Sequence, residues 1–365
     1  MHVSELDTPA LMIDLDIFER NLCRVADYTK ANDLRLRPHT KTHKVPAVGK
    51  RQLDSGAIGL TVAKVGEAEV MLGSGTPDLL VAYPVIGRAK LERLTEVARK
   101  TRVTVALDSS FAARQLSEAA RQAQVSFAVL AEVDVGLGRV GVSPGEELVQ
   151  LAQAIERLPR LTFEGITFYP GHIRTAGEDG PEDALRQLGR TVRGMLEDFR
   201  RAGIEVRVVS GGSTPTLFRS HEVTGVNEIR PGTYVYNDVN TVRSGACSWD
   251  DCAVSILATV VSTSKKGQMI VDGGSKTFSS DRLVGSAESS FGRLVEAPEC
   301  VFNNMNEEHG FVDIRRADRK FSVGDRVCII PNHVCVAVNL HEQVYGVRNG
   351  NVELTWKVEG RGKLQ

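Results

Sequence analysis

The sequence predicts an α/β protein: a (β/α)8 barrel of the TIM type, followed by a C-terminal, mainly antiparallel β domain. Three observations support this prediction. Short apolar runs alternate with amphipathic helical stretches from about residue 34 to 240, eight such runs occur, and closely spaced hairpins begin after Gly245. Strands that alternate with helices are typical of a parallel sheet covered by helices. A doubly wound parallel sheet is the alternative architecture.

The eight predicted barrel strands are nearly continuous in Val, Ile, Leu and Ala, as expected for parallel strands buried on both faces. They are Leu34–His39, Ile58–Val62, Leu79–Tyr83, Val103–Leu107, Phe127–Val133, Phe163–Phe168, Val206–Val209 and Val226–Ile229. Helical periodicity occurs between them at Ala89–Lys100, Phe111–Ala123, Glu146–Arg157 and Pro181–Arg201. Asp108-Ser109 and Ser143-Pro144 supply signals for the start of two of these helices.

The C-terminal region reads as strands joined by tight turns, among them Lys265-Lys266-Gly267 and Asn349-Gly350. The predicted strands are Val254–Ser262, Met269–Val271, Gly310–Ile314, Val327–Ile330, Val334–Leu340, Gln343–Val347 and Val352–Trp356. We therefore expect a barrel over residues 10–242 and a β domain over residues 243–365. Residues 1–16 could add one strand, Leu11–Asp14, to the β domain.

Composition excludes several classes of protein. The 365 residues carry 45 Lys and Arg against 46 Asp and Glu, so no positive excess exists for nucleic acid or anionic lipid. No basic and apolar leader is visible, and no apolar stretch approaches the roughly 18 residues of a membrane helix. Six dispersed cysteines do not form a disulfide framework. We expect a cytoplasmic protein with reduced thiols.

A basic cluster closes the first predicted barrel strand, with the sequence Arg37-Pro38-His39-Thr40-Lys41-Thr42-His43-Lys44. Active sites of TIM barrels lie at the carboxyl ends of the strands, so Lys41 stands where a nucleophilic lysine would project. Neighbouring cations can lower the pKa of a lysine and favour a Schiff base. A solvated basic loop is the alternative interpretation.

Two further loops follow barrel strands and could reach the same mouth. In Glu132–Val142, glycines permit an irregular loop that carries Arg139 toward a ligand, although no helix opens there as a dinucleotide fingerprint requires. Tyr169-Pro170-Gly171-His172 brings an aromatic ring and an imidazole. His172 is a candidate catalytic base, and a structural histidine is the alternative.

The loops after the seventh and eighth predicted strands are candidates for binding phosphate, because TIM barrels often bind phosphate there. The first loop is Ser210-Gly211-Gly212-Ser213-Thr214, whose backbone N–H groups and hydroxyls could form a cradle. The second is Arg230-Pro231-Gly232-Thr233-Tyr234-Val235-Tyr236-Asn237-Asp238. Plain turns are the alternative for both.

His333 and Cys335 form a candidate metal pair in the β domain. On a strand, residues two positions apart face the same side, so one ring nitrogen of His333 and the sulfur of Cys335 could bind one ion. Imidazole with thiolate favours Zn²⁺, and two protein ligands leave positions open for substrate and water. A buried cysteine beside an exposed histidine is the alternative.

Together these motifs resemble the family of metal-activated D-threonine aldolases and eukaryote-type D-serine dehydratases, which are fold-type III pyridoxal 5′-phosphate (PLP) enzymes related to alanine racemase. The resemblance begins with the cluster around Lys41 and continues through Lys64-Val65-Gly66-Glu67-Ala68-Glu69, Glu132–Val142, both candidate phosphate loops and Pro331–Leu340. Several independent motifs in the same order make this resemblance specific.

The resemblance implies a PLP-binding barrel, a β domain and a homodimer. It implies that Lys41 holds PLP covalently, that Arg139 approaches the cofactor's phenolic oxygen and that Tyr169 lies at its edge. It also implies a phosphate-binding set and a divalent-metal pair, with Zn²⁺ favoured over Mn²⁺. The phosphate set comprises Ser210, Gly211, Gly212, Ser213, Gly232, Thr233 and Tyr234, and the metal pair is His333 and Cys335.

The implied substrate is a small β-hydroxy-D-amino acid. The first choice of reaction is retro-aldol cleavage to glycine and an aldehyde, with Lys41 and His172 as catalytic residues; dehydration of D-serine to pyruvate and ammonia is the alternative. The His-x-Cys pair is that of the dehydratases, whereas known aldolases carry His-x-Asp. A histidine of the aldolases is replaced here by Arg174-Thr175. An amino-acid racemase and a non-catalytic PLP-binding protein are further alternatives.

Overall fold

A computed structural model describes residues 1–173, 181–283 and 290–365, and the chain divides into two compact units. The barrel unit comprises Cys23–Lys41, Pro46–Gly232 and Gly362–Gln365. The β unit comprises Met1–Leu22, Thr42–Val45 and Thr233–Arg361. We describe each unit by itself. Among the described residues, no helix is long and apolar enough to cross a membrane.

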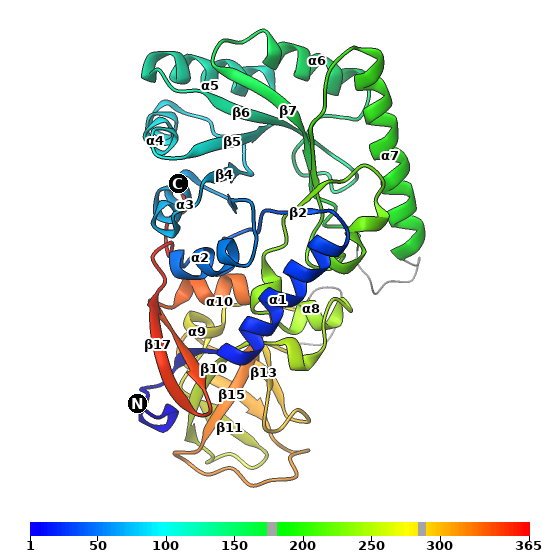
Figure 1. The fold of residues 1–365 in the computed structure, drawn as a ribbon. Helices are drawn as coiled ribbons and strands as arrows, with labels where there is room; N and C mark the ends of the chain where they lie inside the picture. Colours follow the sequence, from blue (N-terminus) through cyan, green and yellow to red (C-terminus); the bar gives the residue numbers. More distant parts are fainter. Residues whose placement is uncertain (174–180, 284–289) are drawn as a thin grey trace. The chain divides into compact units, whose positions relative to one another are not determined.

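Among the described residues, the barrel unit contains eight parallel strands in the order β2-β9-β8-β7-β6-β5-β4-β3. Figure 1 labels β2 and β4 to β7 of this sheet. Beyond β2, His39 forms a parallel bridge with Thr61 of β3, and the Thr40 N–H donates to the Thr61 carbonyl over 2.8 Å. The two ends of the sheet are thereby joined. The predicted barrel is confirmed, and the doubly wound alternative is wrong, because an open sheet has two unpaired edges.

The elements of the barrel unit match all eight predicted strands and all four predicted helices. The strands are β2 (Arg35–Leu36), β3 (Leu60–Val62), β4 (Asp78–Val81), β5 (Arg102–Leu107), β6 (Phe127–Val133), β7 (Leu161–Phe168), β8 (Val208–Gly211) and β9 (Glu228–Ile229). The helices are α2 (Pro46–Asp54), α3 (Val65–Met71), α4 (Arg88–Ala98), α5 (Ser110–Ala123), α6 (Glu146–Glu156) and α7 (Pro181–Arg201), with short 3₁₀ turns at Leu72–Ser74 and Leu217–Glu222.

Burial explains why these strands were recognisable. Every residue of β3, β4, β6 and β8 is buried, which is the pattern of parallel strands covered on both faces. Helix α5 begins as predicted, since the Ser109 side chain accepts the Ala112 N–H over 3.3 Å. Helix α6 does not begin at Ser143, because its N-cap is Gly145 with φ +103°.

The β unit contains a nine-stranded sheet, built mainly from antiparallel pairs along the path β13-β14-β11-β10-β1-β16-β17, with β15 paired to β10 and β12. The predicted early strand is confirmed: β1 (Ala10–Asp14) pairs antiparallel with β10 (Val254–Ser262) and parallel with β16 (Gln343–Arg348). The Asn349-Gly350 turn joins β16 to β17 (Asn351–Lys357), with φ +49° and +74°.

The remaining elements of this unit complete the sheet and its connections. The strands are β11 (Gln268–Val271), β12 (Gly292–Leu294), β13 (Val301–Met305), β14 (Gly310–Asp313) and β15 (Arg326–Pro331). The helices are α8 (Val239–Arg243), α9 (Ser275–Phe278) and α10 (Val334–Leu340), with 3₁₀ turns at Val3–Glu5, Thr233–Val235 and Trp249–Asp251. Helix α1 (Leu15–Ala31) begins in the β unit and ends in the barrel unit.

One predicted strand is wrong, because Val334–Leu340 forms helix α10. Its valines recur at every second position, which is typical of a strand, yet the buried residues are Val334, Ala337 and Val338, at helical spacing. The Val334 N–H is bound by the carboxylate of Asp238, which satisfies a helix-end donor. The argument that His333 and Cys335 share one face of a strand therefore fails, and their placement has another cause.

We predict that Gly165→Ala destabilises the barrel. Gly165 in β7 has φ +148°, and a Cβ atom there would lie 1.9 Å from the Val208 carbonyl oxygen of β8. Backbone strain and overpacking together should lower the free energy of unfolding by about 2–5 kcal/mol, measured by chemical denaturation. The control is Gly194→Ala in α7, where no heavy atom lies within 4 Å and a gain of about 0.5–1 kcal/mol is expected. Equal effects of the two substitutions would refute this account.

Candidate active site

Three of the predicted site residues meet at the carboxyl ends of the barrel strands. Lys41 follows β2 and is exposed, and its Nζ lies 6.0 Å from the centroid of the Tyr169 ring, just after β7. From the loop after β6, the guanidinium carbon of Arg139 lies 4.9 Å from the same centroid. Both cations therefore lie near the Tyr169 ring, at the end of the barrel where TIM-barrel enzymes have their active sites.

The loop after β6 is shaped by one carboxylate. The Oδ1 atom of Asp134 accepts the N–H groups of Gly136, Leu137 and Gly138 over 2.9, 3.0 and 3.1 Å. These hydrogen bonds, mainly the one from Gly136 and then the one from Gly138, lower the pKa of Asp134 below its usual value. The ring of His172 packs on this loop, because a Cβ at Gly136 would lie 3.3 Å from its Nε2. His172 is thus beside the loop that carries Arg139. Arg174 and Thr175 lie outside the described residues.

The candidate phosphate loop after β8 offers backbone donors. Among the described residues, no group accepts a hydrogen bond from the backbone N–H of Gly212, Ser213 or Thr214. Gly211 must lack a side chain, since a Cβ there would lie 2.5 Å from the Phe168 ring. Three consecutive N–H groups after a parallel strand can bind a phosphate. This loop therefore fits the phosphate of the cofactor implied by the sequence.

Ser210 has a different placement from its neighbours. Its side chain is fully buried in β8 and donates to Glu228 Oε1 over 2.6 Å, while the Arg230 guanidinium donates to its hydroxyl oxygen. Arg230 also donates to the Phe168 carbonyl over 3.0 Å. Ser210 therefore supports the loop from behind, and its hydroxyl is already committed to these two partners.

Sequence reasoning missed a buried carboxylate in the barrel wall. Glu132 of β6 is 7% exposed, and within the described residues its Oε2 has no hydrogen-bond partner. Burial raises the pKa of Glu132, although the charges of Arg230 and Arg139 oppose this shift. A lone glutamate within an apolar strand was a local signal, since Glu is rarely buried without a partner.

The metal pair is organised by the start of α10. His333 is its N-cap residue, Cys335 lies in its first turn, and the Nδ1 of His333 lies 3.3 Å from Asp238 Oδ2. Burial opposes protonation of the ring, but the negative charges of Cys335 and Asp238 outweigh it and raise the pKa of His333 to about 11. The Thr42 Oγ1 contacts the Cys335 sulfur at 3.1 Å.

This donor set fits a divalent metal. The side chains of His333 and Cys335 interact with each other, and a metal ion bound by both would take the place of the hydrogen between them. Within the described ranges, no group of three or more His, Cys, Asp and Glu side chains is arranged to hold an ion, so the protein would supply two ligands. Two ligands leave positions open, as a catalytic metal requires.

The chain passes from the barrel unit to the β unit at two places, and both are next to predicted site residues. One passage lies between Lys41 and Thr42, and the other lies between Gly232 and Thr233. Within the β unit, the Oγ1 atoms of Thr42 and Thr233 lie 3.1 and 3.9 Å from the Cys335 sulfur. The residues that follow Lys41 and Gly232 in the chain therefore both reach the metal pair. Tyr234 is buried in the turn after Thr233.

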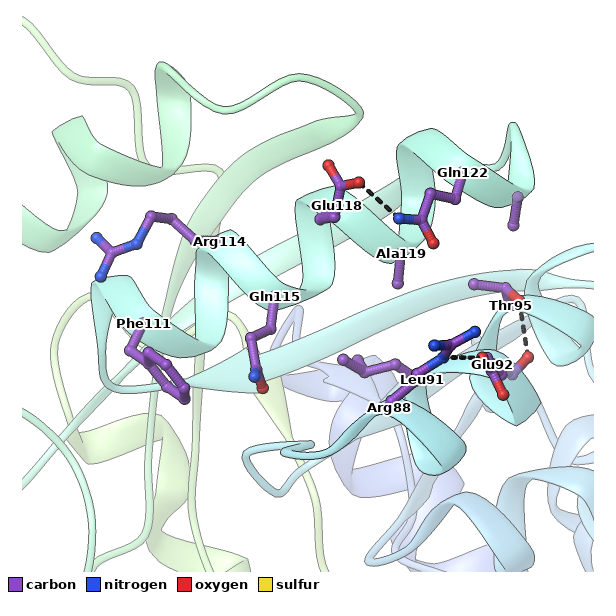
Figure 2. Close-up of a pocket in the computed structure, with 11 residues that line it drawn as sticks. Arg88, Leu91, Glu92, Thr95, Phe111, Arg114, Gln115, Glu118, Ala119 and Gln122 are labelled. Carbon is purple, nitrogen blue, oxygen red and sulfur yellow. Dashed lines mark hydrogen bonds and ion pairs between the residues drawn. The ribbon is translucent and has the colours of Figure 1, made fainter.

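A groove of about 640 Å³ lies elsewhere in the barrel unit, between α4 and α5 (Figure 2). It is lined by Phe111 and by polar side chains of both helices, among them Arg88, Glu92, Arg114 and Glu118. None of the predicted site residues lines this groove. It is therefore separate from the candidate active site.

Comparison with known proteins gives two family matches that together cover most of the chain. Residues 13–239 match the model of the alanine racemase N-terminal domain, and residues 253–347 match a serine dehydratase domain. A D-threonine aldolase of Arthrobacter sp. is 33% identical over 99% of this chain and 94% of its own length.

Two solved structures are similar over nearly the whole chain. The D-threonine aldolase of Filomicrobium marinum has a TM-score of 0.90 and 33% identity, covering 99% of this chain and 98% of that one. A D-threo-3-hydroxyaspartate dehydratase, in which a cysteine is replaced by alanine and which is in a metal-free form, has a TM-score of 0.86 and 31% identity, covering 98% of both chains.

We predict that Glu132→Gln has a pH-dependent effect on stability. Because the pKa of Glu132 is raised in the folded state, the native protein loses stability as pH rises from the unfolded pKa through the folded pKa. Glutamine cannot ionise, so the melting temperature of the variant relative to wild type should increase as the pH rises from 5 to 8, a range that lies above the acid's ordinary pKa of about 4.3. Thermal melts at both pH values measure this difference. Glu359→Gln, at an exposed position, is the control; a flat difference for Glu132→Gln would contradict the prediction.

Proposed function

The chain belongs to the alanine racemase-like family of fold-type III PLP enzymes, in the branch with a C-terminal serine dehydratase domain, and from this premise we propose that it is a lyase of β-hydroxy-D-amino acids. The observation that carries this proposal is the grouping of Lys41 and Arg139 around Tyr169 at the carboxyl ends of the strands. The relatives named above are a D-threonine aldolase and a hydroxyaspartate dehydratase, and both kinds of substrate are β-hydroxy-D-amino acids.

PLP would be held from both ends by residues of this chain. Lys41 Nζ is the nucleophile that would bind its aldehyde, while Arg139 and Tyr169 would orient its ring. The N–H groups of the Gly212–Thr214 loop would bind its phosphate, with Gly211, Gly232, Thr233 and Tyr234 shaping the cradle and Ser210 supporting it through Arg230. When bound, PLP supplies an electron sink for a substrate bond that breaks at the α-carbon.

His333 and Cys335 would hold a divalent metal, for which an imidazole and a thiolate favour Zn²⁺ over Mn²⁺. Such an ion supplies a Lewis acid for the substrate's β-hydroxyl group. The residues themselves orient that group by fixing the position of the ion. The resemblance to a dehydratase that can be prepared metal-free supports the use of a metal.

Retro-aldol cleavage to glycine and an aldehyde is the first choice of reaction. It needs a base for the β-hydroxyl proton, and the exposed ring of His172 packs against the loop that carries Arg139. We assign the base to a ring nitrogen of His172, with Lys41 Nζ as the second candidate. A relative found by sequence and one found by structure, both D-threonine aldolases, support this choice.

Dehydration to an oxo acid and ammonia is the second candidate, and the thiolate ligand favours it. The similar dehydratase carries a cysteine whose replacement by alanine was combined with a metal-free form, and Cys335 is a cysteine of the metal pair here. In that reaction a base at the barrel mouth would remove the α-proton, and the β-hydroxyl would leave. Lys41 Nζ, which would hold the cofactor, is the candidate base for that role.

We further propose that the protein is a cytoplasmic homodimer and that its two domains divide near residue 242. The six thiols are free, as suits a reducing compartment, and the two family matches end and begin at residues 239 and 253. The substrate is a small zwitterion, which suits a chain with a net charge of −1.

We predict that Lys41→Ala abolishes the visible absorbance of the purified, PLP-supplemented protein, because no other residue would supply the amine that binds the aldehyde. Ultraviolet–visible spectroscopy after gel filtration measures this loss. Lys50→Ala is the control, since Lys50 is exposed and paired with Asp54 over 2.6 Å. A colourless wild-type protein that does not take up PLP would refute the cofactor assignment.

We predict that D-threonine with Zn²⁺ or Mn²⁺ yields glycine and acetaldehyde, and that a chelator stops the reaction. His333→Ala should lose the metal-dependent rate while keeping the visible colour, because it removes a metal ligand and leaves Lys41 intact. Chromatography of the products and a pyruvate assay with D-serine distinguish the two reactions. Pyruvate and ammonia without glycine would replace the aldolase by the dehydratase.

A further inference from the structure

Asp238 lies between the starts of two helices of the β unit, and its side chain is fully buried. It is the N-cap residue of α8, and its carboxylate also binds the start of α10, 96 positions later in the chain. Sequence reasoning placed Asp238 at the end of the second phosphate loop and gave it no role. The structure places it beside His333.

The two carboxylate oxygens have separate tasks. Oδ1 accepts the Thr241 N–H over 2.8 Å and the Thr241 hydroxyl over 3.0 Å, which caps α8. Oδ2 accepts the Val334 N–H over 3.0 Å and lies 3.3 Å from His333 Nδ1. Oδ1 therefore caps α8, and Oδ2 contacts His333 and the start of α10.

The second contact determines which nitrogen of His333 is available. An ionised carboxylate only accepts hydrogen bonds, so the hydrogen of the neutral ring must stand on Nδ1, toward Asp238. The lone pair then stands on Nε2. Carboxylate–histidine–metal arrangements of this kind fix the ring and raise the basicity of the ligand.

The charge of Asp238 points to the same conclusion. Burying a charged carboxylate without a paired cation destabilises the folded state. Among the described residues, no Lys or Arg forms an ion pair with Asp238, and its only ion-pair partner is the His333 ring. A cation bound through His333 would therefore compensate a charge that the fold otherwise buries among neutral donors.

We propose that Asp238 is the positioning residue of the metal pair: it sets His333 to bind the ion through Nε2, and by binding the Val334 N–H it holds the turn that carries Cys335. This inference rests on the proposed function, because it requires a metal at His333 and Cys335. One carboxylate thus positions both ligands, although it contacts only one of their side chains.

The test is Zn²⁺ affinity, measured by calorimetry on the PLP-loaded protein after metal removal by a chelator and dialysis. Asp238→Asn should weaken Zn²⁺ binding by about 10–100-fold. One of the two oxygens becomes an NH₂ group, which donates hydrogen bonds, so the side chain can no longer accept hydrogen bonds at the starts of both helices. Thr241→Val is the matched control, since it removes a hydroxyl from Oδ1 and leaves the contacts of Oδ2 intact. Its affinity should equal that of the wild type even where its melting temperature falls.

The outcomes separate this inference from the proposed function. Loss of Zn²⁺ binding in His333→Ala together with wild-type affinity in Asp238→Asn would overturn the role of Asp238 and leave the metal site standing. Unchanged binding in His333→Ala would overturn both. Should Asp238→Asn fail to fold, ¹⁵N spectra of the histidine rings in the zinc-loaded wild type decide the matter: a hydrogen on Nδ1 of His333 supports the proposal, and one on Nε2 overturns it.

Discussion

The barrel depends on one buried carboxylate, that of Glu228. Two of its strands, β2 and β9, have only two residues each, so few backbone hydrogen bonds join them. Glu228 is fully buried, pairs with Arg37 over 3.1 Å and accepts the Ser210 hydroxyl over 2.6 Å, which links β9 to both of its neighbours. Removal of one partner of a buried ion pair typically costs about 3–5 kcal/mol. The loop that offers its N–H groups to a phosphate begins directly after β8, so its position follows from this linkage.

The sequence revealed the strands better than the helices around them. Strands buried on both faces need a continuous apolar run, and that requirement is local, so all eight were visible. Helix α10 was taken for a strand because its valines alternate, and its true state depends on Asp238, which is far away in the chain. The alternating valines outweighed the helical spacing of Val334, Ala337 and Val338, and the contact with Asp238 that stabilises the start of the helix has no signal in this segment.

The candidate site shows the same division. Lys41, Arg139 and Tyr169 stand in motifs that follow strands, and the barrel brings strand ends together, so their grouping was predictable. The supporting residues Glu132, Asp238 and Thr42 act as single buried polar groups. Glu132 was detectable as a lone glutamate in an apolar strand. Asp238 and Thr42 gave no such signal, because their partners are known only when the chain has folded.

The pairing of β1 has a consequence for synthesis of the chain. Leu11 pairs with Ile256, and Met12 pairs with Tyr345, so β1 can pair with β10 only after the barrel sequence has been synthesised, and with β16 only later still. Strands β3 to β9 of the barrel can associate earlier, because each pairs with the strand before or after it in the chain, although β2 must wait for β9. The pairing of Ala10–Asp14 therefore remains incomplete during translation until β16 has been synthesised.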